Sequence, residues 1–428
     1  MIRSGAAGRM ILQGGGMIRQ ASTVIVGGGI WGLSTAYHLA RAGSTDVLVL
    51  ERNDRLFDET TSQAAGLVGQ IRATPLMRRA VRYAIDLCMG FEAETGHDPG
   101  FRQVGSLLLA LTPDRVASFK EHVEHANENG VEAHFVDEAE MSRLTPQLDV
   151  SRVEGGYFVP RDGYLDPSQF ARAFCAAAED LGVRIQMGTA ATGLSMREGW
   201  VTGVETDRGL VEAERVVVTA GPWTGVISKK MAGYEPAMVP IRHQRVTTVP
   251  APGIPGHHPV VRVTDASCYL RPESGGYLYG FFEPDPTSYD LERLPAGFGT
   301  ADIEEPVEVM REARGRLAPV FPIVKELEVA HYKRGLTTFA PDGAYLVGPV
   351  SGVGGLFAAT GCAALGIAGS AAVGRWLANW VARGDPGEDL SSVDPERFGD
   401  RAADREWVRK ESKAFYGGYY SVDSMSVA

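Results

Sequence analysis

Near its start the chain orders its apolar and polar positions as strand, glycine turn, helix and strand. Thr23–Val26 is a short β-branched run, Ile30–Ala42 repeats its apolar residues with the period of a helix, and Val47–Leu50 is continuously apolar. A continuously apolar strand is typical of a parallel sheet that is buried on both faces. These residues therefore predict a βαβ unit.

The same alternation returns further along the chain. Asp166 and Pro167 are typical of an N-cap and a first helical position, and they predict a helix that runs to about Leu181. Asp137 and Glu140 have the spacing of a capping box at the start of another helix. Strand-like runs follow at 183–185, 201–206 and 215–219.

The pattern changes between 240 and 328, where strand-like runs carry many prolines and aromatic residues. We therefore expect an α/β fold in which a Rossmann-type nucleotide-binding domain is interleaved with a mostly antiparallel α+β substrate domain. The expected segments are an extension at 1–20, the nucleotide-binding domain at 21–100, 155–240 and 328–384, the substrate domain at 101–154 and 241–327, and a tail at 385–428.

Composition excludes several classes of protein. The formal net charge of the 428 residues is -11, and no long basic block stands out, so a nucleic-acid partner is not expected. Four cysteines without a CxxC pair indicate reduced thiols in a cytoplasmic protein rather than disulfides or a metal site. Residues 355–374 are uncharged but rich in glycine and alanine, so a buried helix is favoured over a membrane span.

Three glycines carry the main functional signal. Gly27, Gly29 and Gly32 form G-x-G-x-x-G directly after one strand and at the start of a helix. This arrangement allows a tight turn, close approach of a pyrophosphate and close packing of helix on strand. Glu51 ends the next strand, where an acid accepts hydrogen bonds from ribose hydroxyls. The unit predicts a dinucleotide site at the N-terminus of the helix.

Three later segments favour FAD over NAD. Residues 51–72 form a polar, glycine-bearing loop where an NAD domain would continue with another βαβ unit. Residues 215–221, RVVVTAG, and 356–369, LFAATGCAALGIAG, each run from a strand into a small-residue turn. The second turn predicts a helix N-terminus that would face the electron-rich edge of a reduced flavin.

Longer motifs identify a family resemblance. The chain resembles the FAD-dependent amine oxidoreductases of the D-amino-acid oxidase/glycine oxidase superfamily, and within it the FAD portions of sarcosine dehydrogenase and dimethylglycine dehydrogenase. The similar segments are ETTSQAAGLVGQIR (59–72), FRQVGSLLLA (101–110), VPRDGYLDP (159–167), VVVTAGPW (216–223), VRVTDASCYLRPE (261–273), FAPDGAYLVGP (339–349) and the tail motif at 397–422.

The sequence departs from these relatives at three places. Gln63 stands where the two dehydrogenases carry flavin covalently on a histidine, and no cysteine linkage is found near Lys333–Gly335, so FAD is expected to be held non-covalently. Thr337 stands where glycine oxidase-like enzymes have a carboxylate-binding arginine. The chain also stops where the folate-binding domain of those dehydrogenases would begin.

The motifs and the resemblance together give a set of expected FAD contacts. These come from the glycine turn, the end of the second strand, the loop after it and the two later turns. The residues are Gly27, Gly29, Ile30, Trp31, Gly32, Glu51, Arg52, Thr61, Ser62, Gln63, Ala65, Gly66, Leu67, Ala220, Gly221, Trp223, Gly361, Cys362, Ala364, Leu365 and Gly366.

The candidate catalytic residues are polar side chains on segments expected to face the flavin. Arg72 resembles an arginine near the flavin in sarcosine oxidases, and His243 is suited to proton transfer from an amine. Tyr269 and Arg271 share one strand face by their spacing, and Tyr279 lies on the next strand. The alternatives are sheet packing for each tyrosine and a solvent-facing position for Arg271. Arg271, or Lys333 and Arg334, would suit a substrate carboxylate.

The expected reaction is FAD-dependent oxidation of a C–N bond in a secondary or tertiary amine such as an N-methyl amino acid, by hydride transfer to flavin N5 and imine hydrolysis. The expected partners are the amine and molecular oxygen or another electron acceptor, without membrane or nucleic acid. Two alternatives stay open. One is oxidation of another amine or imino acid in a biosynthetic pathway, and the other is an FAD-bearing subunit whose aromatic tail docks a partner.

Overall fold

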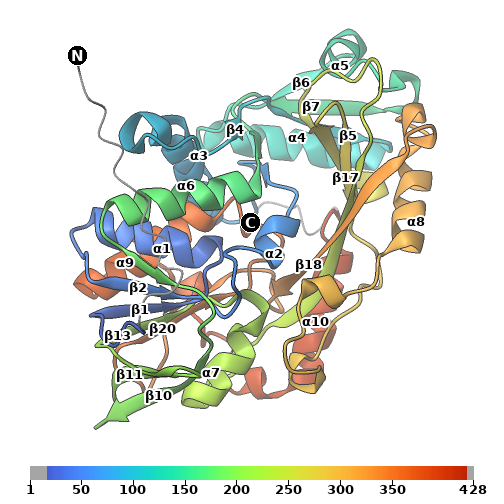
Figure 1. Ribbon diagram of the computed structural model, residues 1–428. Coiled ribbons are helices and arrows are strands. Elements are labelled where there is room, and N and C mark those ends of the chain that lie inside the picture. The colour runs from blue at the N-terminus through green and yellow to red at the C-terminus, as the bar shows by residue number, and fades with distance from the viewer. Residues whose placement is uncertain (1–16, 422–428) are drawn as a thin grey trace, which may run out of the picture.

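The computed structural model describes residues 17–421, so most of the predicted extension at 1–20 and the end of the predicted tail lie outside the described residues. It confirms the predicted α/β fold class: a largely parallel sheet and a larger, mostly antiparallel sheet form two lobes (Figure 1). A shared cavity lies between these lobes.

The first lobe is built on a six-stranded sheet. Its strand order is β19-β20-β13-β1-β2-β9, and all neighbours pair in parallel except the edge strand β19. The strands are β1 (Thr23–Val26), β2 (Val47–Leu50), β9 (Arg184–Gln186), β13 (Arg215–Val218), β19 (Leu346–Pro349) and β20 (Leu356–Thr360).

Successive side chains of β1 and β2 enter two different cores. Ile25 and Val49 pack under a layer of helices, whereas Val24 and Leu48 pack against a three-stranded sheet on the opposite face. Burial on both faces explains why these strands are continuously apolar. The helices are α1 (Ile30–Arg41), α3 (Pro75–Thr95), α6 (Pro167–Asp180) and α9 (Ser370–Arg383), and the opposite face carries β10 (Ala191–Arg197), β11 (Trp200–Thr206), β12 (Gly209–Glu212) and α7 (Thr224–Ala232).

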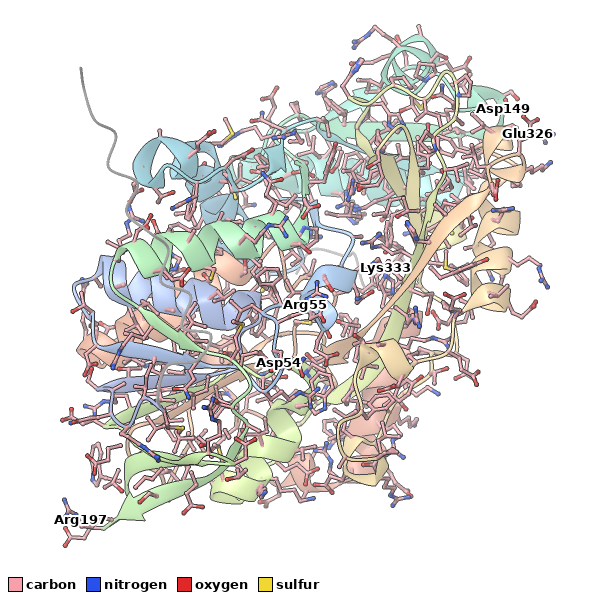
Figure 2. The ribbon with its side chains drawn as sticks, in the orientation of Figure 1. Asp54, Arg55, Asp149, Arg197, Glu326 and Lys333 are labelled. Carbon is pink, nitrogen blue, oxygen red and sulfur yellow. The ribbon has the colours of Figure 1, made fainter. Side chains whose placement is uncertain are left out.

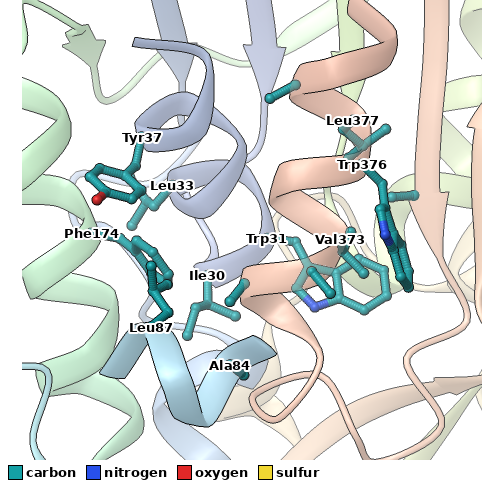
Figure 3. Close-up of a cluster of buried hydrophobic side chains, with 14 of the residues drawn as sticks. Ile30, Trp31, Leu33, Tyr37, Ala84, Leu87, Phe174, Val373, Trp376 and Leu377 are labelled. Carbon is teal, nitrogen blue, oxygen red and sulfur yellow. The ribbon is translucent and has the colours of Figure 1, made fainter. Parts of the chain in front are cut away.

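Helix α1 is the centre of the helical layer. Figure 3 shows Leu33 and Tyr37 of α1 packed near Phe174 of α6, with Trp31 beside Trp376 of α9. Eleven of the twelve residues of α1 are buried, as expected for a helix enclosed by three others. The N-terminus of α1 therefore has a fixed position at the edge of the sheet.

The second lobe is built on an eight-stranded sheet with the order β18-β14-β17-β16-β15-β5-β7-β6. Among the described strands of this sheet, only β15 and β5 pair in parallel. Helix α8 (Val307–Leu317) covers the outer face, and α4 (Pro113–Glu128) and α5 (Glu138–Leu144) lie near the far edge (Figure 1). The strands are β5 (Ser106–Ala110), β6 (His134–Val136), β7 (Gly155–Val159), β14 (Val239–Thr248), β15 (Val260–Val263), β16 (Cys268–Glu273), β17 (Gly276–Phe281) and β18 (Val329–Phe339).

Short elements and the tail connect the two lobes. A small sheet, β3 (Leu67–Val68), β8 (Gly163–Leu165) and β4 (Phe101–Arg102), follows α2 (Thr60–Gln63) along the boundary. After α9 the chain runs back across the molecule into α10 (Arg405–Gly417), which packs on β14 and β18. Figure 2 marks opposite ends of the molecule, with Arg197 at the tip of β10 and Asp149 and Glu326 at the outer edge of the second lobe.

Several local predictions are settled by these elements. The N-caps are confirmed: the Asp166 side chain accepts from Gln169 N, and the Asp137 side chain accepts from Glu140 N. The strands β7 and β18 pair within the eight-stranded sheet, although the expected boundaries at 155 and 328 placed both segments in the nucleotide-binding domain. Within residues 17–421, no helix has the length and hydropathy that crossing a membrane requires.

Candidate functional site

A cavity of about 440 Å³ lies between the two lobes. Its walls come from the glycine turn, the loop around α2, the turns after β13 and β20, and the inner face of the eight-stranded sheet. The residues that line it are therefore far apart in the sequence, and one end faces the six-stranded sheet while the other faces the inner strands of the second lobe.

The glycine turn fits a nucleotide because it has no room for side chains. Gly27 has φ +113, and a Cβ there would lie 2.7 Å from the carbonyl oxygen of Thr219. A Cβ on Gly32 would lie 2.0 Å from the carbonyl oxygen of Gly27, so this glycine permits close packing of α1 on the turn. Gly29 is the N-cap of α1 and lines the cavity. The helix N-terminus thus presents its partial positive charge to the cavity, as binding of a pyrophosphate requires.

Glu51 lies directly after β2 and also lines the cavity. Its Oε2 accepts from Gly28 N at 2.9 Å, and its Oε1 accepts from Asn53 N at 2.9 Å. Burial raises the pKa of Glu51, while these two backbone hydrogen bonds oppose the shift. Each carboxylate oxygen keeps a lone pair, so the side chain can accept hydrogen bonds from hydroxyl groups.

The loop around α2 forms a second wall at the end of the cavity that contains the glycine turn. Ile30 N donates to Thr61 Oγ1 at 3.2 Å, which ties this loop to the start of α1. The Arg52 guanidinium lies 3.9 Å from the centre of the Trp223 ring and pairs with Glu59 at 3.0 Å. These contacts bring three chain segments together around the space between the glycine turn and the second lobe.

The small-residue turn after β20 lies at the opposite wall and is tightly bonded. Ala363 and Ala364 have positive φ values of 45 and 55, and Ala364 N donates to Thr337 Oγ1 at 3.0 Å. Thr337, the threonine noted above in place of a carboxylate-binding arginine, therefore fixes this turn through its hydroxyl group. The expected helix N-terminus is not here: α9 begins only at Ser370, and the last residue of this turn that lines the cavity is Ile367.

Most of the expected cofactor contacts share this cavity. Ser62 and Gly32 do not line it, because the Ser62 hydroxyl turns back to the carbonyl oxygens of Asp58 and Glu59 and Gly32 serves packing. Direct contacts with FAD stay predictions for the lining residues. Gly361, which was also expected, does not line the cavity. The expected residues that do line it are Gly27, Gly29, Ile30, Trp31, Glu51, Arg52, Thr61, Gln63, Ala65, Gly66, Leu67, Ala220, Gly221, Trp223, Cys362, Ala364, Leu365 and Gly366.

The inner face of the eight-stranded sheet presents a row of side chains to the other end of the cavity. Strand register aligns Tyr269 with Arg262, Arg262 with Leu108, and Leu108 with Tyr157. Directly paired residues point to the same face of a sheet, and all four of these line the cavity. One row across four strands thus brings a guanidinium and two phenols into one wall.

His243 and Tyr269 are joined by a hydrogen bond in this wall. Tyr269 Oη lies 2.9 Å from His243 Nε2, and Gly280 makes this approach possible because a Cβ there would lie 2.1 Å from Tyr269 Oη. Burial lowers the pKa of His243 to about 3, and the positive charge of Arg245 adds to the shift. The imidazole is therefore neutral near pH 7 and has one nitrogen that accepts a proton.

Two arginines approach the same group of phenols. Arg262 is buried and donates to Ser106 Oγ at 2.9 Å, whereas Arg72 is half-buried and its Nε has no hydrogen-bond partner. Burial raises the pKa of Tyr157, whose hydroxyl also has no hydrogen-bond partner among residues 17–421, and both arginines oppose that shift. Asp162, buried nearby, accepts from Gln70 N at 2.9 Å, and its pKa is raised by burial and lowered by Arg262.

Four residues considered for substrate binding lie outside the cavity lining. Arg271 shares the strand face of Tyr269, but it stacks on Tyr164 at 4.3 Å and donates to the carbonyl oxygen of Ala65 and to Glu273. Tyr279 points to the outer face, where Arg314 donates to its hydroxyl. Lys333 lies on β18 beside the α2 loop (Figure 2), and Arg334 donates to carbonyl oxygens of Ile303 and Ala301.

Sequence reasoning missed Arg262, Tyr157 and Asp162 as members of this wall. Arg262 has a recognisable signal, since a lone arginine between Val261 and Val263 interrupts an apolar strand. The tail also reaches the site: Phe415, Tyr419 and Tyr420 line the cavity. The tail thus packs against the eight-stranded sheet of its own chain.

Comparison with known proteins agrees with the fold and the glycine turn. The family described as FAD dependent oxidoreductase matches residues 22–380. Mitochondrial dimethylglycine dehydrogenase of Rattus norvegicus is 32% identical over 406 residues, which are 93% of this chain and 47% of that protein. The 4-methylaminobutanoate oxidase (formaldehyde-forming) of Paenarthrobacter nicotinovorans is 33% identical over 400 residues, 94% of this chain and 48% of that protein.

Among solved structures, L-proline dehydrogenase from P. horikoshii has the same fold, with a TM-score of 0.79 at 24% identity over 89% of this chain and 98% of that one. The chain spans about half the length of the two curated relatives. The match over residues 22–380 shows that the chain belongs to the FAD dependent oxidoreductase family. The predicted resemblance is confirmed, and the glycine turn and Glu51 fit the FAD cofactor of this family.

Proposed function

We propose that the protein oxidises the C–N bond of a secondary or tertiary amine that also carries a carboxylate, with an N-methyl amino acid as the substrate class. The single observation that carries this proposal is the wall formed by Arg262, Arg72, Tyr157 and the Tyr269–His243 pair. It offers an anion-binding region and a proton-accepting region within one cavity.

The charges in this wall favour one carboxylate. Arg262 and Arg72 are cationic, and Asp162, the buried acid that interacts electrostatically with Arg262, leaves an excess of one positive charge. The unpartnered Tyr157 hydroxyl adds a donor. A substrate carboxylate would supply the missing negative charge, and charge-assisted hydrogen bonds to it are among the strongest that proteins make.

The names of the relatives support the same class. Dimethylglycine and 4-methylaminobutanoate both combine a methylated amine with a carboxylate, and the second relative is named as forming formaldehyde. The number of carbons between amine and carboxylate differs between them. We therefore propose the class and leave chain length to the substrate panel below.

When bound, FAD supplies the two-electron oxidant, which takes hydride from the carbon next to nitrogen. The residues of this chain have three tasks around that chemistry. Arg262, Arg72 and Tyr157 hold the carboxylate, the Tyr269–His243 pair takes the proton of the ammonium, and the aromatic residues of the tail limit access of water. Hydrolysis of the resulting imine gives formaldehyde and the demethylated amine.

We also propose that FAD is held non-covalently. Gln63 lines the cavity beside Gly335, the Gln63 amide is not nucleophilic, and glycine has no side chain that could bind flavin. Cys362 also lines the cavity, but its sulfur lies 3.2 Å from Thr337 Oγ1 in the turn after β20. Acid precipitation of the purified protein should leave all yellow colour in the supernatant; colour that stays with the protein would contradict non-covalent binding.

The test of function is an anaerobic titration of the FAD-loaded protein, followed through the visible flavin band. Sarcosine, dimethylglycine and 4-methylaminobutanoate form one group, and proline and D-alanine form the second. The expected result is that members of the first group bleach the flavin band and that one formaldehyde forms for each flavin reduced. Admitting air then distinguishes oxygen from another electron acceptor.

Bleaching by proline alone would point instead to an imino acid as substrate. If no compound bleaches protein that carries FAD, the N-methyl amino acid proposal is wrong. A second FAD-loaded sample, titrated with dithionite, controls for flavin that is bound but cannot be reduced.

A further inference from the structure

A chain of buried hydrogen bonds runs from His243 away from the cavity. His243 Nδ1 lies 2.8 Å from Tyr416 Oη, and Tyr416 Oη lies 2.8 Å from Glu283 Oε2. Glu283 pairs with Arg242 at 3.3 Å between Oε1 and Nη2. Tyr416 and Glu283 are both buried, and Tyr416 comes from α10, more than 170 positions after His243 in the chain.

Donors and acceptors in this chain have only one consistent order. A carboxylate accepts hydrogen bonds and donates none, so Tyr416 gives its single proton to Glu283. The Tyr416 oxygen must then accept from His243 Nδ1–H. Because a neutral imidazole carries one N–H, Nε2 has no proton and accepts from the Tyr269 hydroxyl.

We propose that Tyr416 and Glu283 are positioning residues that hold His243 in the tautomer with hydrogen on Nδ1, so that Nε2 faces Tyr269 as a base. The inference rests on the proposed function, because it gives the Tyr269–His243 pair a proton to remove. In this step the substrate ammonium gives its N–H proton to Tyr269 Oη, and the Tyr269 proton moves to His243 Nε2. After the step the amine has a free lone pair, and His243 is an imidazolium.

The surroundings of His243 favour the neutral imidazole with which this step begins. Tyr269 and Tyr416 contact its two nitrogens, the Phe282 ring packs on it at 4.4 Å, and Arg245 on the same strand face disfavours the cation. Before the step the imidazole is neutral, as the tautomer argument requires. After the step Glu283, acting through Tyr416, offsets part of the cost of the imidazolium.

The chain offers a matched control on the same sheet. His258 Nε2 lies 2.8 Å from Tyr277 Oη, and both side chains are buried outside the cavity lining. Tyr277→Phe removes a buried tyrosine–histidine hydrogen bond without touching the chain of residues that starts at Tyr269. Any effect that is only a loss of packing or stability should appear equally in this variant.

The first experiment reads the tautomer directly in the FAD-loaded protein without substrate. Nitrogen NMR of protein labelled with ¹⁵N-histidine, with the His243 signal assigned through His243→Gln, should give a protonated Nδ1 and a bare Nε2. Tyr416→Phe should shift this signal towards protonated Nε2, and Tyr277→Phe should leave it unchanged. A protonated Nε2 in the wild-type protein, or no change in Tyr416→Phe, would overturn the proposal.

The second experiment measures the rate of flavin reduction from pH 6 to pH 10, using the amine that bleaches the wild-type protein best. Tyr416→Phe and Glu283→Gln should be slower by roughly 100-fold near pH 7. The deficit should shrink towards pH 10, where the substrate itself supplies the neutral amine. A deficit that is equal at every pH indicates a structural role and overturns the assignment.

The two experiments separate the inference from the proposed function. If no amine reduces the flavin, the proposed function is wrong, while the NMR result still decides the tautomer. Glu283→Gln keeps the size of the side chain and all of α10, so it covers the case in which Tyr416→Phe does not fold. FAD content, measured for each variant, shows that every rate refers to loaded protein.

Discussion

Arg262 illustrates how one residue sets a property of the whole site. It is buried, and its hydrogen-bond partner Ser106 is neutral. The acid that interacts with it electrostatically is Asp162. A buried cation without full compensation is costly unless a ligand completes its pairing. That cost is the physical reason to assign Arg262 to substrate binding instead of to sheet stability.

Arg262→Met should therefore weaken binding of a carboxylate substrate selectively. Loss of one charge-assisted pair corresponds to a rise in Kd of roughly 10- to 100-fold for dimethylglycine. The methyl ester of dimethylglycine has no carboxylate, and its Kd should change little. Kd values come from the dependence of the anaerobic reduction rate on substrate concentration, and equal losses for acid and ester would contradict the role of Arg262.

Gly27 has a comparable influence on the shape of the cavity at the glycine turn. Gly27→Ala combines a positive φ with a collision against Thr219, and should lower FAD affinity on the order of 10- to 100-fold. Gly43→Ala is the control, because Gly43 has φ +96 and nothing within 4 Å of its added Cβ. Fluorescence titration of the apoprotein with FAD measures both, and similar losses in both variants would show that backbone strain alone is responsible.

Buried histidines outside the site give a pH dependence of stability. Burial lowers the pKa of His258 to about 4 and that of His38 to about 4. The unfolded chain takes up these protons near pH 6.5, so their stabilising effect is complete above pH 6.5 and is lost as the pH falls towards 4.

Between pH 7.5 and pH 5 the wild-type protein should therefore lose about 2 kcal/mol of unfolding free energy for each of these groups. His258→Gln cannot take up a proton there and should lose about 2 kcal/mol less over the same interval. Urea unfolding at the two pH values measures the difference. An identical loss in variant and wild type would mean that His258 titrates normally in the folded protein.

At the scale of elements, the closest packing is between α1 and α9. A Cβ on Gly374 would lie 2.2 Å from Ser34 Oγ and 2.6 Å from the backbone carbon of Ser34, so the two helices cross with almost no space between them. This contact holds α9 against α1, and with it the turn after β20 against the glycine turn. Trp31 Nε1 adds a hydrogen bond of 2.8 Å to the carbonyl oxygen of Gly366.

Gly374→Ala should thus destabilise the protein by about 1–3 kcal/mol through overpacking. Gly90→Ala makes the same chemical change in the exposed part of α3, where nothing lies within 4 Å, and should stabilise by about 0.5–1 kcal/mol. Denaturant unfolding of the two variants should give shifts of opposite sign. A neutral Gly374→Ala would show that α1 and α9 move apart easily.

At the scale of the whole molecule, the cavity in which we propose that FAD binds lies between the two lobes. FAD contacts from both lobes would tie their stabilities together, since a ligand that binds only the folded form stabilises it. Removing FAD should lower the melting temperature, and re-adding FAD should restore it. Riboflavin, which lacks the pyrophosphate, is the control and should restore much less; equal restoration would mean that the glycine turn contributes little.

Sequence patterns predicted well those features that depend on neighbouring residues. The βαβ unit, the Asp166 cap and the cofactor class follow from local periodicity and spacing. The wall of the substrate end depends on strand register instead, and register between β16, β15, β5 and β7 is not encoded locally. For this reason the sequence named Tyr269 as a candidate but not its directly paired neighbour Arg262, and it offered Arg271 as one candidate although the Arg271 guanidinium is engaged elsewhere.

The position of β1 inside its sheet has a consequence for biosynthesis. Its neighbour β2 follows within a few tens of residues, but the other side of the sheet needs β13 and β20, which starts at Leu356. At ribosomal speeds of roughly 5–20 residues per second, the nascent chain waits roughly 15–65 s for that strand. During this time an apolar sheet edge is exposed, so we expect chaperone demand on the ribosome to persist until α9 has been translated.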